Sequence, residues 1–304
     1  MRALALLLLL PPLLPGAAAA QDACAGSWGR LVAATEGMLH GEARPAADGW
    51  CEVWDARLGG TGAPTAYAAD LLRWRGEGLD RVAEGTGLPA ALEVEVERLW
   101  VVQQTGNAAL DWIFAVQYAR TGIDGRLAAE WDAAARTLRV TELVADLPGR
   151  NAVAATATLA GVDLSTIGAA QTSLGSVALT AFEAEVVADG LFESYLLPLA
   201  AFRLGSAGDP QARFKAFQAQ AVAEAERLPP AIFTGDTPAE LAELLRDLPS
   251  PLGTLRVTLA APDGAGVGAP RFARSGAPQA PAELWPALEG LTITADWTPL
   301  PPEE

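Results

Sequence analysis

Leu92-Glu93-Val94-Glu95-Val96-Glu97 alternates strictly between apolar and acidic residues. A period of two is the pattern of a β-strand that buries one face and leaves the other in water. The stretch 110–118 is predicted to be the next strand, with four large side chains on one face: Trp112, Phe114, Val116 and Tyr118. Residues 122–125, Gly-Ile-Asp-Gly, supply turn chemistry after it.

Further alternating stretches continue this pattern toward the C-terminus. They cover residues 127–131, 137–142, 153–159 and 177–187, and short turn sequences such as Pro-Gly-Arg-Asn at 148–151 separate them. Strands that are joined by short turns, without a helical crossover, pair antiparallel. The sequence therefore predicts an antiparallel meander.

The pattern changes to a helical period after residue 190. Residues 209–227 contain an apolar stripe, and Thr237-Pro238-Ala239-Glu240 has the form of a capping box with proline at the first helical position. Two last strands are predicted at 255–259 and 291–297. The predicted fold class is α+β: a curved, mainly antiparallel β-sheet meander with helices packed on one face.

These patterns divide the chain into five segments. We expect a signal peptide at 1–20, a disulfide-bearing N-terminal segment at 21–90, the antiparallel meander at 91–190, a helical segment at 191–250 and C-terminal strands that complete the sheet at 251–304. Within the N-terminal segment, Ser27 is expected to cap a helix that extends through Leu39.

The first 20 residues predict export. Arg2 precedes a leucine-rich run that contains Pro11 and Pro12, and small residues up to Ala20 end the segment. This order is typical of a cleavable secretory signal peptide. An uncleaved membrane anchor is the less favoured alternative, because the apolar run is about half of the roughly 20 residues that a spanning helix needs. We expect a periplasmic protein without a membrane span after cleavage.

Cys24 and Cys51 are the two cysteines of the chain. In an oxidising compartment they are expected to pair as a disulfide, which would close a loop of roughly 28 residues and contribute about 3 kcal/mol in the loop-entropy model. Two cysteines and the single His40 do not supply the four ligands of a structural zinc site. No metal site is therefore predicted.

Charge and motifs exclude several classes of function. The chain has 37 acidic and 21 basic residues and a formal net charge of −16. Such a charge disfavours nucleic acid and anionic lipid headgroups as partners. The sequence lacks the Gly-x-Ser-x-Gly elbow, the Walker loop and the Rossmann glycine pattern. We therefore predict no catalytic set and no cofactor.

Carboxylates near tryptophan are the remaining catalytic candidates. Asp111, Glu130 and Asp132 lie beside Trp112 and Trp131 in the sequence. Two carboxylates next to an aromatic side chain are typical of the active site of a glycoside hydrolase. The competing interpretation places Asp132 in a turn and Glu130 on the solvent side of a strand. A periplasmic glycan hydrolase with carboxylates near Trp131 is the alternative function.

Two C-terminal motifs support a resemblance. Asp247-Leu248-Pro249-Ser250-Pro251-Leu252-Gly253, and Leu-Thr-Ile-Thr-Ala-Asp-Trp at 291–297, resemble uncharacterised envelope proteins of alphaproteobacteria. The alternating strands also resemble, more loosely, the β-rich periplasmic proteins of the AsmA-like group. That resemblance implies a long curved sheet with an apolar inner face, and a role in outer-membrane assembly or phospholipid transport.

The favoured function is that of an exported, non-enzymatic envelope protein that binds a lipid-like or apolar ligand, or a protein partner. Five side chains are expected to line an apolar cleft: Trp112, Phe114, Val116, Tyr118 and Trp131. The competing interpretation is that these five form the core under the helices. A third hypothesis is a purely structural adaptor with a protein partner.

Overall fold

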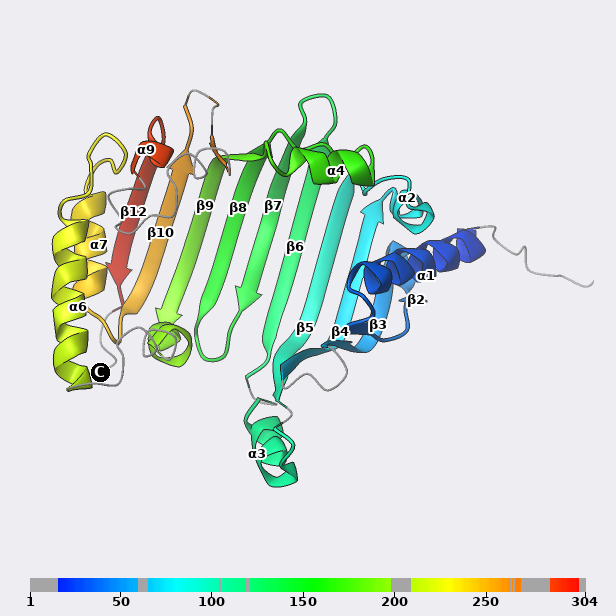
Figure 1. The fold of residues 1–304 in the computed structure, drawn as a ribbon, viewed down its shortest axis with the longest axis horizontal. Helices are drawn as coiled ribbons and strands as arrows, with labels where there is room; N and C mark the ends of the chain where they lie inside the picture. The colour runs from blue at the N-terminus through cyan, green and yellow to red at the C-terminus, as the bar shows by residue number, and fades with distance from the viewer. Residues whose placement is uncertain are drawn as a thin grey trace, which may run out of the picture.

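The computed structural model describes residues 16–59, 65–103, 105–118, 121–197, 209–262, 264, 266–268 and 285–300. Within these residues, twelve strands form one open sheet in which every strand pairing is antiparallel (Figure 1). The strands are β1 (Leu39–His40), β2 (Arg44–Pro45), β3 (Cys51–Leu58), β4 (Thr65–Glu77), β5 (Ala91–Gln103), β6 (Ile123–Asp132), β7 (Thr137–Asp146), β8 (Ala152–Ala160), β9 (Ala178–Asp189), β10 (Leu252–Ala260), β11 (Val267–Gly268) and β12 (Thr292–Pro299).

The order of the strands is that of a meander. From β3 to β10 they lie side by side in the order of the chain, and β12 completes the sheet next to β10. The short strands β1 and β2 pair with β3, and β11 pairs with β9. The predicted α+β class with a large antiparallel sheet is therefore confirmed.

Helices lie at the ends and along the rim of this sheet (Figure 1). They are α1 (Gly16–Ala34), the 3-10 turn η1 (Ala47–Gly49), α2 (Leu79–Glu84), α3 (Ala108–Tyr118), α4 (Ile167–Ser173), the π-helical turn η2 (Phe192–Leu196), α6 (Pro210–Ala225), α7 (Thr237–Arg246) and α9 (Trp285–Leu288). In Figure 1, α1 lies in front of β3 and β4, α6 and α7 lie at the β12 end, and α3 projects beyond the end of β5 and β6.

The N-terminal helix begins earlier than the sequence predicts. Ser27 does not cap it, because α1 already starts at Gly16 and ends at Ala34. Residues 1–15 of the predicted signal peptide lie outside the described residues, and residues 16–20 belong to α1. Inside the helix, the Ser27 hydroxyl donates to the backbone oxygen of Cys24 at 3.1 Å.

The strand predicted at 110–118 is wrong, because these residues form α3. The side chain of Asn107 accepts hydrogen bonds from the backbone N–H groups of Ala109 (3.0 Å) and Leu110 (3.3 Å) and thereby starts the helix. A short run that is apolar at almost every position satisfies both a period of two and a period of 3.6, so periodicity does not distinguish them. The turn predicted at 122–125 is also wrong, because β6 already begins at Ile123.

The register gives the sheet an apolar face and a charged face. Residues directly opposite each other in antiparallel strands lie on the same face. One row that crosses the sheet from β3 to β12 is apolar throughout: Cys51, Trp74, Val94, Leu127, Leu143, Ala155, Ala184, Val257 and Ala295. The adjacent row on the other face is mostly charged: Glu52, Arg73, Glu95, Arg126, Val144, Ala154, Glu185, Arg256 and Asp296.

Candidate functional site

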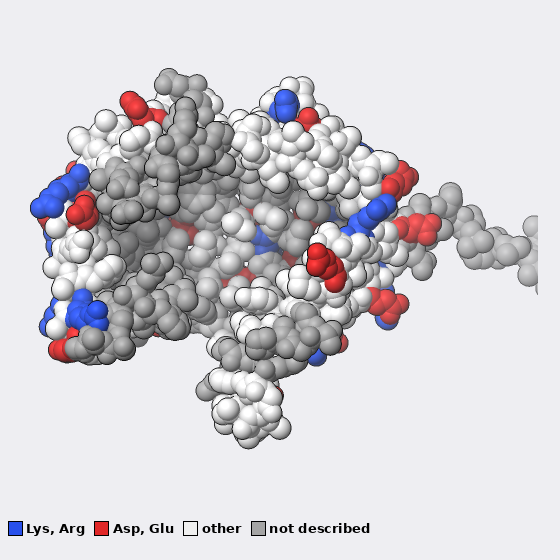
Figure 2. Space-filling view, viewed as in Figure 1, with Lys and Arg blue, Asp and Glu red and all other residues white. Residues whose placement is uncertain are grey.

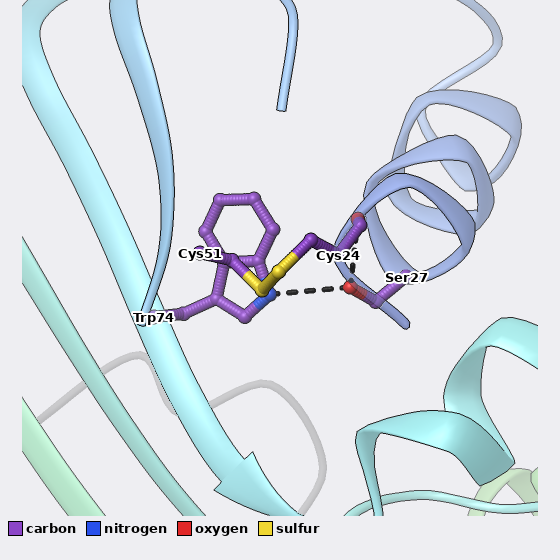
Figure 3. The surroundings of a disulfide bond; sticks show 4 residues. All are labelled: Cys24, Ser27, Cys51 and Trp74. Carbon is purple, nitrogen blue, oxygen red and sulfur yellow. Dashed lines mark hydrogen bonds between the residues drawn. A yellow bond between two sulfur atoms is a disulfide. The ribbon is translucent and has the colours of Figure 1, made fainter. Parts of the chain in front are cut away.

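The first end of the apolar face is covered by α1, which a disulfide fastens to β3 (Figure 3). Cys24 of α1 and Cys51 of β3 form the predicted bond, with their Cα atoms 5.4 Å apart. Both cysteines are buried, together with Val53 of the same strand. The disulfide and the apolar side chains around it therefore form a closed core at this end.

Two tryptophans complete this core. Trp28 of α1 stacks on Trp74 of β4, with ring centroids 5.6 Å apart and planes inclined by 22°. The Trp28 indole N–H donates to the backbone oxygen of Gly41 at 2.9 Å, and the Trp74 indole N–H donates to the Ser27 hydroxyl at 3.2 Å. Both buried indoles thus have a hydrogen-bond acceptor, as burial of this polar group requires.

The other end of the sheet is closed by the segment from Ile232 to α7. The backbone N–H of Ile293 donates to the oxygen of Ile232 at 2.7 Å, and the Thr234 N–H donates to the oxygen of Ile293 at 3.0 Å. Farther along β12, the N–H of Ala295 donates to the Thr237 hydroxyl at 2.9 Å. The edge strand therefore finds partners for N–H groups that would otherwise be free to recruit another strand.

The side chains of the predicted capping box accept hydrogen bonds from the edge strand β12 instead of from the N–H groups of their own helix. Besides the Thr237 contact, the Glu240 carboxylate accepts from the backbone N–H of Trp297 at 3.0 Å. The indole of Trp297 is buried on the apolar face and contacts the position of Gly253, where a Cβ atom would lie 2.6 Å from the ring. Gly253 thus makes room for this ring beside β10.

The middle of the apolar face lies between these two covered ends. Across β5 to β8 its side chains are half-buried, and Leu143 is 42% exposed. In the described part of the chain, no helix packs broadly against β6, β7, β8 or β9. Figure 2 views this face and shows a central hollow in which uncharged residues predominate. The hollow is the candidate ligand-binding surface.

The charged face of the sheet carries ion pairs between neighbouring strands. Arg73 pairs with Glu95, and Arg126 lies between Glu95 (3.5 Å) and Glu142 (3.2 Å), so that ion pairs bridge four successive strands. Next to this ladder Arg75 pairs with Glu93 at 2.6 Å. These pairs supply cross-strand complementarity on a surface that remains in water.

Trp50 extends the charged face at its β3 end. The guanidinium groups of Arg73 and Arg75 lie 4.9 and 4.6 Å from its ring centroid, which is cation–π distance. The hydrogen bond from Arg75 to Glu93 raises the pKa of this guanidinium. The ion pairs with Glu95 and Glu93 thus hold both guanidinium groups over the ring.

The structure separates the five predicted cleft residues into two places. Trp131 lies on the apolar face of β6, and its indole N–H donates to the backbone oxygen of Val162 at 3.0 Å. Trp112, Phe114 and Val116 belong to α3, beyond the end of the sheet (Figure 1). Tyr118 is the last residue of that helix, and its side chain lies outside the described part of the chain.

The candidate carboxylates are not brought together. Asp111 in α3 accepts from the backbone N–H (2.6 Å) and the hydroxyl (2.7 Å) of Thr105. Asp132, at the far end of β6, accepts from the backbone N–H groups of the following turn at Ala134 and Ala135. Glu130 is exposed on the charged face, opposite to Trp131. These contacts give each aspartate a local structural role.

Most side chains of the apolar face were not among the predicted cleft residues. The side chains in its middle that were not singled out come from four strands: Leu92, Val94, Leu127, Val140, Leu143 and Val153. The signal was present for five of them, which occupy the apolar positions of alternating stretches. Leu143 is the exception, because it is out of phase with Val140 and reaches this face only through a register shift between the two residues. What was needed in addition was the register, which aligns these positions into rows.

A second apolar groove lies away from this face. It has a volume of about 390 Å³ and runs between η2, α6 and the end of α7, where Phe214, Leu197, Leu248 and Pro249 line it. The amide of Gln218 in the same groove donates to the backbone oxygens of Leu245, Arg246 and Leu248. Gln218 thus ties α6 to the C-terminus of α7, which gives this contact a structural role.

Among the described residues, no three His, Cys, Asp or Glu side chains gather in a group that could hold a metal ion. None of the helices in the described ranges has both the length and the apolar character that crossing a membrane requires. In comparisons with known proteins, no family model, no curated sequence and no solved structure matches this chain.

Proposed function

We propose that this protein is an exported, non-enzymatic envelope protein that binds a lipid-like, apolar ligand on the middle of its apolar face. The observation on which the proposal depends is the register. It aligns Val94, Leu127, Leu143 and Ala155 in one row without a charged residue, between an end covered by α1 and an end closed by α7. A half-buried apolar surface of this kind suits the acyl chain of a lipid.

Among the described residues, the helices that cover the apolar face lie at its two ends. α1 protects the β3–β4 end through Trp28 and the disulfide, while Trp297 and α7 protect the β12 end. Between them, a ligand would lie across β5 to β8 and replace water on side chains such as Leu143. Removal of that apolar area from water supplies the driving force for binding.

Export is the second part of the proposal. The buried Cys24–Cys51 disulfide supports it, because structural disulfides persist in oxidising compartments. Cleavage after Ala20 would remove the first five residues of α1, Gly16 to Ala20, and leave Cys24 and Trp28 in place. The mass of the protein isolated from the periplasm tests this step, since the mature chain is expected to begin at Gln21.

Ligand binding is tested by a pair of substitutions in one strand. Leu143→Glu places a charge on the apolar face, whereas Val144→Glu places the same charge on the opposite face, next to Arg126. We expect the mature protein to bind a fluorescent fatty acid and to co-purify with lipid in native mass spectrometry. Leu143→Glu should weaken fatty-acid binding at least tenfold, and Val144→Glu should leave it unchanged.

Two results would contradict this proposal. One is a wild-type protein that neither retains lipid nor binds the fatty acid. The other is an equal loss of binding in both variants, because a specific role of the apolar face requires that they differ. Circular dichroism of both variants separates loss of binding from loss of folding.

A further inference from the structure

The described side chains of α3 that are exposed are all apolar. This helix lies in the long connection between β5 and β6 and projects beyond the sheet (Figure 1). Seven of its described side chains are exposed, and all are apolar: Ala108, Ala109, Leu110, Trp112, Ile113, Ala115 and Val116. Trp112 is 67% exposed, which is unusual for the largest apolar side chain of a helix.

The exposed apolar side chains extend around most of the helix, and Gln117, which falls in the same arc, has no described side chain. Because successive residues advance by about 100°, the seven exposed positions cover an arc of roughly 220°. The two half-buried side chains in the described part of α3, Asp111 and Phe114, occupy the remaining side. The carboxylate of Asp111 accepts two hydrogen bonds from Thr105, so the one described charge of α3 is directed to its own preceding loop.

This arc is wider than a protein groove requires. A helix that docks in a groove presents an apolar stripe little more than 100° wide and keeps polar residues on the opposite side. An element that is apolar almost all round is instead suited to a medium that surrounds it, such as the acyl-chain region of a lipid layer. Tryptophan favours the boundary between headgroups and acyl chains.

We propose that α3 docks the protein on a phospholipid bilayer by insertion into one leaflet. Its 11 residues extend over about 16 Å, which is too short to cross a hydrocarbon core of about 30 Å. We expect this bilayer to consist of zwitterionic lipids. Anionic headgroups attract cations, whereas the described exposed side chains of α3 include no cation and the whole chain has a net charge of −16. This docking site is separate from the ligand-binding face.

Flotation with vesicles of phosphatidylcholine and phosphatidylethanolamine tests the proposal on the mature protein. We expect the wild-type protein to float with the vesicles and Trp112→Glu to lower the bound fraction at least tenfold. Trp54→Glu is the matched control, since Trp54 is also exposed (58%) but lies on β3, far from α3 along the chain. Its binding should equal that of the wild type.

A second measurement does not depend on a charged substitution. Brominated lipids quench nearby tryptophan fluorescence, so quenching should fall in Trp112→Phe and stay unchanged in Trp54→Phe. Absence of vesicle binding by the wild type, or equal effects of the two sites, would overturn the proposal. A dimer in sedimentation that Trp112→Glu dissociates would also overturn it, because α3 would then bind a second copy of the chain.

The two proposals fail separately. Leu143→Glu should abolish fatty-acid binding and leave vesicle flotation intact, whereas Trp112→Glu should do the reverse. If Leu143→Glu also prevented flotation, insertion of α3 would not be an independent docking step, and the proposal for α3 would be wrong.

Discussion

The indole rings of Trp28 and Trp74 stack at a centroid distance of 5.6 Å and join the N-terminal helix to the first long strand of the sheet. Both side chains are about 5% exposed. The helix α1 is also attached to β3 by the disulfide and to α2, where Arg30 donates to the backbone oxygens of Ala83 (3.3 Å) and Glu84 (3.0 Å), so the stack is one of three attachments of α1.

Replacement of Trp28 by alanine should lower the free energy of unfolding by about 3–5 kcal/mol, because it removes a large buried ring and leaves a cavity. Urea denaturation with an unchanged m-value measures the effect. Trp54→Ala is the matched control: its side chain is 58% exposed, so its effect should stay within about 0.5 kcal/mol. Equal effects of the two substitutions would show that the stacked ring of Trp28 contributes no more to the free energy of unfolding than an exposed tryptophan does.

The disulfide should stabilise the same end of the molecule through the unfolded state. Cys24 and Cys51 are separated by 27 positions, and closure of such a loop contributes about 3 kcal/mol. The double variant Cys24→Ser, Cys51→Ser should lose this amount in urea denaturation. The wild type under reducing conditions should behave in the same way. A loss below about 1 kcal/mol would mean that the packing of α1 alone holds this end together.

The sheet could be predicted because its strands alternate between apolar residues and charged or polar residues. Glu93, Glu95 and Arg126 occupy every second position of β5 and β6 and fix the assignment of the faces. The run at 110–118 offers no such contrast, since Asp111 is the one charged residue in it. Asn107, a good helix cap, was the local signal for a helix there.

The contacts of the candidate site could not be derived from local sequence. Thr237 and Glu240 correctly marked the start of a helix, but their side chains bind backbone groups of β12, about 57 residues away in the chain. Similarly, strict alternation from Val140 would place Leu143 on the charged face. The register, which shifts between these two residues, instead aligns Leu143 in one row with Leu127 and Ala155. Both relationships are tertiary.

Acid titration should reveal a hydrogen-bonded carboxylate in the loop after β8. The Ser165 hydroxyl (2.6 Å) and backbone N–H (3.0 Å) donate to Asp163, and with the nearby Arg136 they lower the pKa of this carboxyl below its usual value of 3.8. A lowered pKa means that the ionised form is favoured in the folded protein. Its contribution to stability is therefore complete above the unfolded-state pKa and is lost as the pH falls through the folded-state value.

Ser165→Ala should raise the pKa of Asp163 toward its usual value, because it removes the hydroxyl donor, which is the largest cause of the shift. An NMR titration of the carboxyl carbon measures this change. Ser176→Ala serves as the control, since the hydroxyl of Ser176 donates to the oxygen of Ser173 and does not contact Asp163. An unchanged titration of Asp163 in Ser165→Ala would show that the loop does not hold this hydrogen bond in solution.

The closure of the β12 edge is the feature that should matter most for the solubility of the molecule. Thr237→Val keeps the size of the side chain but removes the acceptor of the Ala295 N–H, and a buried donor without a partner costs about 1–3 kcal/mol. Hydrogen exchange at Ala295 should accelerate at least tenfold. The N–H of Ile293 should stay protected, because its acceptor is the backbone oxygen of Ile232.

Thr298→Val is the matched control for this edge, since Thr298 is an exposed residue of the same strand. It should change neither the exchange of Ala295 nor the stability by more than about 0.5 kcal/mol. Combination of Thr237→Val with Glu240→Leu frees two N–H groups of β12 at once, and an exposed strand edge recruits other strands. The double variant should therefore aggregate during heating at temperatures where the wild type remains monodisperse. If light scattering showed no difference between them, the Thr237 and Glu240 side chains would not be what protects this edge.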